Sequence, residues 1–279
     1  MMDYVKLLRV KHYIKNLLIF IPMFFGGVIF EKERLIKASL GFVCFCLISS
    51  AIYILNDYRD IEKDRKHPTK KNRPLASGRV KPNNAIIIMV MLVAIAMVIS
   101  IKLKTIEGAC CLLLYFVLNV AYSMGLKNKP IIDVVILASG FVIRVMYGGY
   151  ITGVEISQWL YLVVTTGSLY MGLGKRRNEL KAQTDTREVL KYYNESFLDK
   201  NMYVCLALAN VFYALWTIDM NSPYISWTVP VFIVMLMCYS LDTEGNSEGD
   251  PVEVILKDRF LISIILVYAV CIFTLLYIA

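Results

Sequence analysis

Long apolar stretches alternate with shorter charged ones along the whole of this 279-residue chain. An apolar stretch of about 20 residues is long enough to cross a lipid bilayer as an α-helix. The alternating polarity that is typical of membrane-spanning β-strands does not occur in these stretches. The pattern therefore predicts an all-α membrane protein, one domain over residues 1–279, with about nine transmembrane helices. The predicted helices lie at about 16–30, 36–56, 83–101, 106–124, 131–152, 157–174, 201–218, 223–241 and 259–279.

The composition agrees with several membrane spans and excludes some kinds of function. Hydrophobic residues make up 58% of the chain and charged residues 19%, and the mean hydropathy is +0.59. A soluble domain averages about 45–50% apolar and about 25% charged residues. We expect no nucleic-acid binding, because no soluble domain is left to carry a basic face. The seven cysteines lie in apolar runs and only two histidines are present, so we expect small apolar filler rather than zinc sites.

The net charge of +8 is concentrated in a few loops. Lys and Arg gather in the N-terminal residues and in the loops after the second, fourth and sixth predicted helices. With nine spans, all four regions lie on one side of the membrane, and the positive-inside rule makes that side cytoplasmic. We therefore expect a multi-pass protein of the cell membrane, with its functional loops in the cytoplasm and its C-terminus outside. The basic residues of "EKERLIK", after the first helix, are an exception.

Three aspartates lie where the second predicted helix leaves the bilayer, in "NDYRDIEKD" (56–64). If the helix continues through this stretch, Asp57, Asp60 and Asp64 lie within about 60° of one another on one face. Carboxylates so close repel one another, and a divalent cation such as Mg²⁺ removes the repulsion. We therefore predict a magnesium site formed by these three aspartates. A solvated helix end, with ion pairs to the neighbouring basic residues, is the alternative.

The next residues, "RKHPTKKNRPLASG", form a basic loop. Helix cannot continue past His67, because Pro68 and Pro74 interrupt it. Lys70 and Arg73, beside a metal site, suit the binding of a polyphosphate. The alternative is that these charges only keep the loop in the cytoplasm.

Two charged residues near or within the fifth predicted helix need a separate explanation. Arg144 lies several turns from either end, where a charge costs about 2.5–3.5 kcal/mol at the bilayer centre. We expect it to face a cavity and bind phosphate, and snorkelling to the interface is the alternative. Asp133, at the start of the same helix, is expected to cap it.

The motif "NDYRDIEKD" followed by "NRPLASG" resembles the first aspartate-rich motif, NDxxDxxxD, of the UbiA superfamily of intramembrane prenyltransferases. "YSMGLK", from Tyr122 to Lys127, agrees with the same family. The resemblance covers nearly the whole chain. It implies helices around a polar cavity that opens to the cytoplasm and sideways to lipid.

The loop after the sixth predicted helix departs from the aromatic prenyltransferases of this superfamily, which carry a second aspartate-rich run there. Here the loop reads "GLGKRRNELKAQTDTREVLKYY", with Asp185 as its only aspartate before Asp199. "GKRRNEL" instead resembles the decaprenyl-phosphate phosphoribosyltransferase branch. So do "RVKHYIKNLLIF", "GFVIRVMYGG" and "LDTEGNSEGDPVEVILKDRFL". Phosphoribosyl pyrophosphate carries phosphate at both ends of its sugar, so its binding favours more cations and fewer anions.

The resemblance implies an Mg²⁺-dependent pentosyltransferase that moves 5-phosphoribose from phosphoribosyl pyrophosphate to a polyprenyl phosphate and releases pyrophosphate. The implied catalytic residues are Asp57, Asp60, Asp64 and Lys175, and the three aspartates are also the metal ligands. The implied substrate-binding residues are Lys15, Asn16, Asn56, Lys70, Arg73, Tyr122, Lys127, Arg144, Arg176 and Glu179.

Two other functions stay open at this point. One is an aromatic prenyltransferase that joins a prenyl diphosphate to an aromatic acceptor. The other is a transporter or lipid-binding protein, which would more often show inverted repeats and helices broken at the midplane. The sequence also leaves open a homo-oligomer, the isoprenoid length, and the roles of Asp242 and Asp258.

Overall fold

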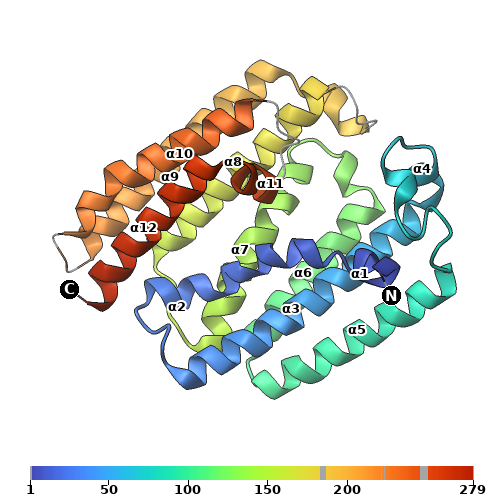
Figure 1. The fold of residues 1–279 in the computed structure, drawn as a ribbon, viewed down its shortest axis with the longest axis horizontal. Helices are drawn as coiled ribbons and strands as arrows, with labels where there is room; N and C mark the ends of the chain where they lie inside the picture. Colours follow the sequence, from blue (N-terminus) through green and yellow to red (C-terminus); the bar gives the residue numbers. More distant parts are fainter. Residues whose placement is uncertain (1, 183–186, 221, 223, 246–250, 279) are drawn as a thin grey trace. The chain divides into compact units, whose positions relative to one another are not determined.

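A computed structural model describes residues 2–182, 187–220, 222, 224–245 and 251–278. Helices and their connections make up this described part, with no strand in it, so the predicted all-α class is confirmed (Figure 1). Seven helices in it are long and apolar enough to cross a membrane, and each matches a predicted span. They are α3 (Lys32–Arg59), α5 (Pro82–Leu103), α6 (Ile106–Met124), α7 (Ile132–Thr152), α9 (Glu195–Asp219), η5 with α10 (Ile225–Glu244) and α12 (Arg259–Tyr277).

The other two predicted spans differ from these seven. The predicted span 157–174 lies, except for its first residue, within α8 (Gln158–Ala182), a continuous helix whose C-terminal part is polar and charged. The prediction of one helix over 16–30 is wrong. That stretch contains the end of the 3₁₀-helix η1 (Val10–Phe20), the short α2 (Ile21–Phe25) and a turn. The total of nine spans stays a prediction.

Polar anchors explain the irregular course of η1. A 3₁₀ run of this length is uncommon. Here Tyr13 shares a hydrogen bond of 2.8 Å with Ser50 of α3, and the Asn16 amide donates to Cys46 Sγ at 3.1 Å. Gly148 of α7 lies so close to the Ile19 carbonyl that a Cβ atom there would overlap it. These tertiary contacts outweigh the local preference for an α-helix.

The described helices fall into two compact units. The first comprises residues 1–23, 28–124 and 143–155, and the second comprises 24–27, 125–142 and 156–279. In the first unit, α1 (Met2–Leu8), η1 and α5 contact α3, and α3 and α5 run side by side (Figure 1). The core of this unit contains the buried side chains of Phe45, Tyr147 and Ile151. The single domain over 1–279 stays a prediction.

A short irregular segment joins α3 to α5 in the first unit. It contains α4 (Ile61–Arg65) and the single 3₁₀ turn η2 (Lys70–Asn72). Leu75 and Val80, at the end of this segment, are buried in a small apolar cluster with Leu7 and Ile54. The polar loop is therefore fixed to the helices at its C-terminal end.

The second unit is built around the pair α8 and α9, which pack along their length, with α10 and α12 beside them (Figure 1). Its shorter elements are η3 (Leu126–Asn128), η4 (Glu188–Tyr192) and α11 (Pro251–Lys257). Asn194 and Asp258 cap α9 and α12, because their side chains accept hydrogen bonds from the amides of Phe197 and Phe260. Asp258 thus has a structural role that the sequence had left open.

Candidate active site

The acidic stretch at the end of α3 is nearly, but not fully, helical. Helix α3 ends at Arg59, Asp60 has φ −95° and ψ 9°, and α4 begins at Ile61. The expected single helix through the stretch is therefore interrupted at Asp60. The amide of Asp64 still donates to the Asp60 carbonyl at 2.7 Å, so the helical register is largely kept.

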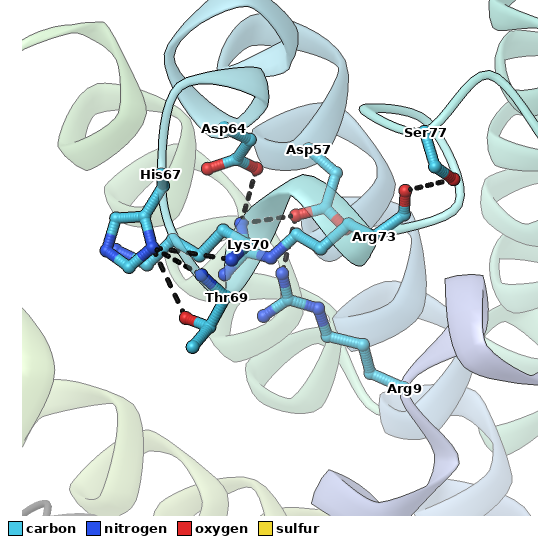
Figure 2. A network of polar contacts seen from close by, with 8 residues as sticks. All are labelled: Arg9, Asp57, Asp64, His67, Thr69, Lys70, Arg73 and Ser77. Carbon is cyan, nitrogen blue, oxygen red and sulfur yellow. Dashed lines mark hydrogen bonds and ion pairs between the residues drawn. The ribbon is translucent and has the colours of Figure 1, made fainter.

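Asp57 and Asp64 converge on one arginine in the first unit. Both are buried, at 3% exposed each. Arg73 Nη1 donates to Asp57 Oδ1 at 3.1 Å and to Asp64 Oδ2 at 2.7 Å (Figure 2). One cationic nitrogen thus bridges two carboxylates, and carboxylate oxygens are among the ligands that Mg²⁺ prefers. Two of the three predicted aspartates therefore fit a magnesium ion. Across the described residues no three His, Cys, Asp or Glu side chains form such a group.

Arg9 is a member of this site that the sequence analysis did not select. Its Nη2 donates to Asp57 Oδ1 at 2.5 Å (Figure 2). Its guanidinium also lies 4.8 Å from the centre of the Tyr53 ring. Its backbone is in the left-handed region, with φ 52°, at the junction of α1 and η1. Few residues other than glycine adopt this conformation. The only sequence signal for Arg9 was its place in "RVKHYIKNLLIF".

The basic loop after α4 is ordered by its own side chains. His67 Nδ1 accepts hydrogen bonds from the amides of Thr69 and Lys70, both at 3.3 Å (Figure 2). The Ser77 hydroxyl donates to the Arg73 carbonyl at 2.8 Å. The predicted end of the helix before Pro68 is confirmed, since α4 ends at Arg65. Lys70 and Arg73 therefore project from a locally braced loop beside the two buried aspartates.

Asn56 and Tyr122, two predicted substrate-binding residues, lie close to one inter-helix contact in the first unit. The Ser123 hydroxyl lies within hydrogen-bond reach of the Asn56 side-chain oxygen and of the Asn119 carbonyl and can donate to either, and its contact with Asn56 links α6 to α3. Tyr122 directly precedes this serine and is half-buried, as is Lys15 on η1.

Arg144 is enclosed within the first unit and does not snorkel. Its Nε donates to Asn16 Oδ1 at 2.7 Å, and its Nη2 donates to the Tyr115 hydroxyl at 2.9 Å. Its guanidinium lies 4.9 Å from the ring centres of both Phe45 and Tyr115. Cation–π contacts and hydrogen bonds thus stabilise the buried charge. The structure brings together Arg144 and Asn16, two of the predicted substrate-binding residues.

The second unit places the "GKRRNEL" residues on the C-terminal half of α8. Arg176 is fully buried, and its Nε donates to Asp133 Oδ2 at 2.5 Å. Its Nη1 donates to Glu179, whose carboxylate also lies 3.6 Å from Arg187 Nε. The side chain of Lys175 is half-buried, as is that of Lys127 on η3.

Asp133 was expected to cap α7, but its carboxylate has other partners. Besides Arg176, it accepts a hydrogen bond of 2.6 Å from the Tyr193 hydroxyl. That hydroxyl accepts one of 2.6 Å from the Ile131 amide. Burial, and next the contact with Asp133, raise the pKa of Tyr193 to about 12, so the hydroxyl remains protonated and donates. Sequence reasoning missed Tyr193, which carries no local signal.

Two stretches that the sequence analysis quoted lie partly outside the described residues. They are Asp185 in the loop after α8, and residues 246–250 of "LDTEGNSEGDPVEVILKDRFL".

Comparisons with known proteins agree with this architecture. The model of the UbiA prenyltransferase family matches residues 19–264. The chain is similar to the decaprenyl-phosphate phosphoribosyltransferase of Corynebacterium glutamicum, with 34% identity over 98% of this chain and 86% of that protein. The enzyme of the same name from Mycolicibacterium smegmatis is 35% identical, over 92% of this chain and 87% of that protein.

Solved structures with this fold include a UbiA homolog from Archaeoglobus fulgidus bound to DMAPP and Mg²⁺. It matches 99% of this chain and 100% of its own, with a TM-score of 0.77 at 18% identity. The same homolog bound to GPP and Mg²⁺ matches with a TM-score of 0.76. Together with the family match over most of the chain, these findings show that the chain belongs to the UbiA prenyltransferase family.

Proposed function

We propose that this chain is a membrane-embedded pentosyltransferase. It transfers 5-phosphoribose from phosphoribosyl pyrophosphate to a polyprenyl phosphate and releases pyrophosphate. The observation that carries the proposal is the near-full-length similarity to two decaprenyl-phosphate phosphoribosyltransferases. The basic "GKRRNEL" of α8, where aromatic prenyltransferases have aspartates, supports it.

In the first unit, the buried aspartates and their arginines form the proposed group that binds the pyrophosphate of the donor. Asp57 and Asp64, with Asp60 as the third predicted ligand, would hold Mg²⁺. When bound, Mg²⁺ supplies positive charge that neutralises the pyrophosphate oxygens. Arg9 and Arg73 already lie against these acids, and their planar guanidinium groups suit phosphate oxygens. Lys70 adds a further cation from the same loop.

The proposed reaction is a substitution at the anomeric carbon of the ribose. An oxygen of the lipid phosphate forms the new bond to this carbon, while the bond from carbon to the pyrophosphate oxygen breaks. The electron pair of that bond leaves with pyrophosphate. No general base is required, because the lipid phosphate is already anionic. Cations fixed around the leaving group lower the barrier, since they stabilise charge where it develops.

The remaining predicted residues would bind the phosphate and hydroxyl groups of the two substrates. Lys127 and Lys175 are the proposed cations of the second unit. Lys15, Asn16, Asn56, Tyr122, Arg144 and Glu179 keep their predicted place in substrate binding. Arg176 was also predicted to bind substrate, but it is fully buried, so we propose that it acts through the residues around it.

We also propose that the loops with these residues face the cytoplasm, because Lys and Arg are concentrated in residues 59–81 and 175–200. Reporter fusions after Lys81 and after Lys200 should both report a cytoplasmic position. An external report from either fusion would contradict this orientation.

Purified protein, Mg²⁺ and labelled phosphoribosyl pyrophosphate test the function directly. With a polyprenyl phosphate as acceptor, label should move into the lipid fraction and pyrophosphate should be released. Thin-layer separation of the lipids reads the result. A parallel reaction with a prenyl diphosphate and 4-hydroxybenzoate should give no prenylated acid. Prenylated aromatic product without any ribosylated lipid would overturn the proposal and leave the family assignment intact.

A further inference from the structure

A buried polar network in the second unit joins three segments that are distant in the sequence. Asp133 comes from the start of α7, Arg176 from α8, and Tyr193 from the residue after η4. The side chains of Asp133 and Arg176 are both 0% exposed. The guanidinium of Arg176 therefore presents no surface to a ligand, and its charge is used within the fold. We call Asp133, Arg176 and Tyr193 the buried clamp.

The strained backbone before α7 shows what the buried clamp fixes. Ile131 has φ +68°, in the left-handed region, where a β-branched residue is a genuine outlier. Such strain persists only where the surroundings determine it. The side chain of Ile131 is 58% exposed, so its own packing does not supply the restraint. The hydrogen bond of 2.6 Å from its amide to the Tyr193 hydroxyl supplies a tertiary restraint, in addition to the local backbone bonds from the Ile132 amide to the Pro130 carbonyl and from the Val135 amide to the Ile131 carbonyl.

The segments joined by the buried clamp carry two lysines that are proposed to bind phosphate. Lys127 lies on η3, four residues before Ile131, and η3 packs against η4. Lys175 directly precedes Arg176 on α8. The Asp133 carboxylate accepts a hydrogen bond from the Tyr193 hydroxyl on one oxygen and from Arg176 Nε on the other. The turn with Lys127 and the α8 residue beside Lys175 are therefore fixed to one buried group.

We propose that Asp133, Arg176 and Tyr193 are positioning residues. They fix the turn that carries Lys127 to the part of α8 that carries Lys175. Both lysines are thereby held in place to bind phosphate groups of the donor. Arg176 acts through its neighbours and does not itself contact the donor. The identity of the donor rests on the proposed function, whereas the restraint on the turn does not.

Tyr193→Phe is the most selective test, because it removes a single oxygen. The ring can stay stacked on Phe197, at 6.0 Å between ring centres, so folding should be retained. Hydrogen exchange of the amides in 125–132 should become faster. The KM for phosphoribosyl pyrophosphate should rise about tenfold, with kcat within about twofold of wild type. Asp133→Asn should change both measurements in the same direction and more strongly.

Two matched variants separate positioning from a general loss of stability. Tyr192→Phe removes the hydroxyl of the exposed neighbouring tyrosine. Asp199→Asn breaks the ion pair with Arg177, which joins α8 to α9 but does not involve the turn before α7. Neither variant should change amide exchange in 125–132 or the KM for the donor.

Three results separate the buried clamp from a direct role of Arg176 in donor binding and from a wrongly assigned donor. Unchanged amide exchange in 125–132 in Tyr193→Phe would overturn the clamp. A large rise in KM for Arg176→Ala, with normal exchange and a normal KM in Tyr193→Phe, would also overturn it and make Arg176 a direct ligand. If wild-type protein transfers nothing from phosphoribosyl pyrophosphate, yet Tyr193→Phe still releases the turn, the donor is wrong and the restraint stands.

Discussion

Two groups of arginine and aspartate in this protein have the same chemistry but different access to solvent. In the first unit, Asp57 and Asp64 are buried, while the side chains of Arg9 and Arg73 are 21% and 29% exposed. In the second unit, both members of the pair Asp133 and Arg176 are 0% exposed. A partly exposed arginine can exchange its acid for a phosphate without loss of solvation. An enclosed arginine cannot, and its interactions serve to fix the fold.

The largest expected effect is on stability and belongs to the enclosed pair. Asp133→Ala leaves the Arg176 charge buried with one acidic partner fewer, which should lower the free energy of unfolding by about 3–5 kcal/mol. Asp57→Ala should cost only about 1 kcal/mol, because Arg9 and Arg73 can turn toward water. Thermal unfolding of both variants in the same detergent compares them. Equal losses of stability would remove the distinction between the two groups.

The next largest effect is on turnover and belongs to the accessible group. Asp57→Asn and Asp64→Asn keep the side-chain shape but lose the charge, so each should lower turnover about a hundredfold or more. Chelation of Mg²⁺ should have a similar effect. The control is Glu62→Gln, because Glu62 is an exposed acid of the same stretch. Normal turnover in both aspartate variants would remove the metal site from the proposal.

A smaller effect is expected from the two partly exposed arginines. Arg9→Ala and Arg73→Ala should each raise the KM for phosphoribosyl pyrophosphate by about ten- to a hundredfold, since a hydrogen bond to a charged group contributes about 1.5–3 kcal/mol. Arg9→Lys should recover only part of the loss, because an ammonium group lacks the planar fork. The exposed Lys200→Ala provides the reference. If Lys200→Ala raised the KM as much as the arginine variants do, these charges would serve only to orient the protein in the membrane.

The smallest effect concerns the bracing of the basic loop by His67. In His67→Asn, the side-chain amide oxygen would take the place of the imidazole Nδ1, whereas in His67→Gln it would lie near the place of Nε2. His67→Asn should therefore keep the hydrogen bonds to the amides of Thr69 and Lys70, and His67→Gln should lose them. We expect a near-normal KM for the first variant and a rise of about threefold for the second. The reverse order would exclude this bracing role.

The hydropathy pattern was sufficient for most of the fold, because a membrane span depends on a continuous local property. Seven helices therefore match predicted spans. The prediction for 16–30 was wrong for two reasons. α2 ends at Phe25 before a turn in which Gly27 has φ 71°. In addition, Tyr13 and Asn16 bond to α3 and hold residues 10–20 in a 3₁₀ conformation. No local pattern records such tertiary contacts.

The sequence likewise allowed only part of the candidate site to be predicted, namely the part that lies within one short motif. Asp57 and Asp64 lie within one short motif, so their common face could be derived from helical spacing. Arg9 lies 48 residues before Asp57, and Tyr193 lies 60 residues after Asp133. Pairings over such distances leave no periodic signal in a single sequence. Burial was also hidden, and it is burial that separates Arg176 from Arg73.

The close contact between Gly148 and the Ile19 carbonyl limits how the first unit can be altered without moving η1. A single methyl group at position 148 would overlap that carbonyl oxygen, so η1 would have to move outward to relieve the overlap. Segment η1 follows directly on Arg9, whose guanidinium must stay within hydrogen-bond reach of Asp57. The alignment of a charge at one end of this segment thus depends on the absence of one carbon atom near the other.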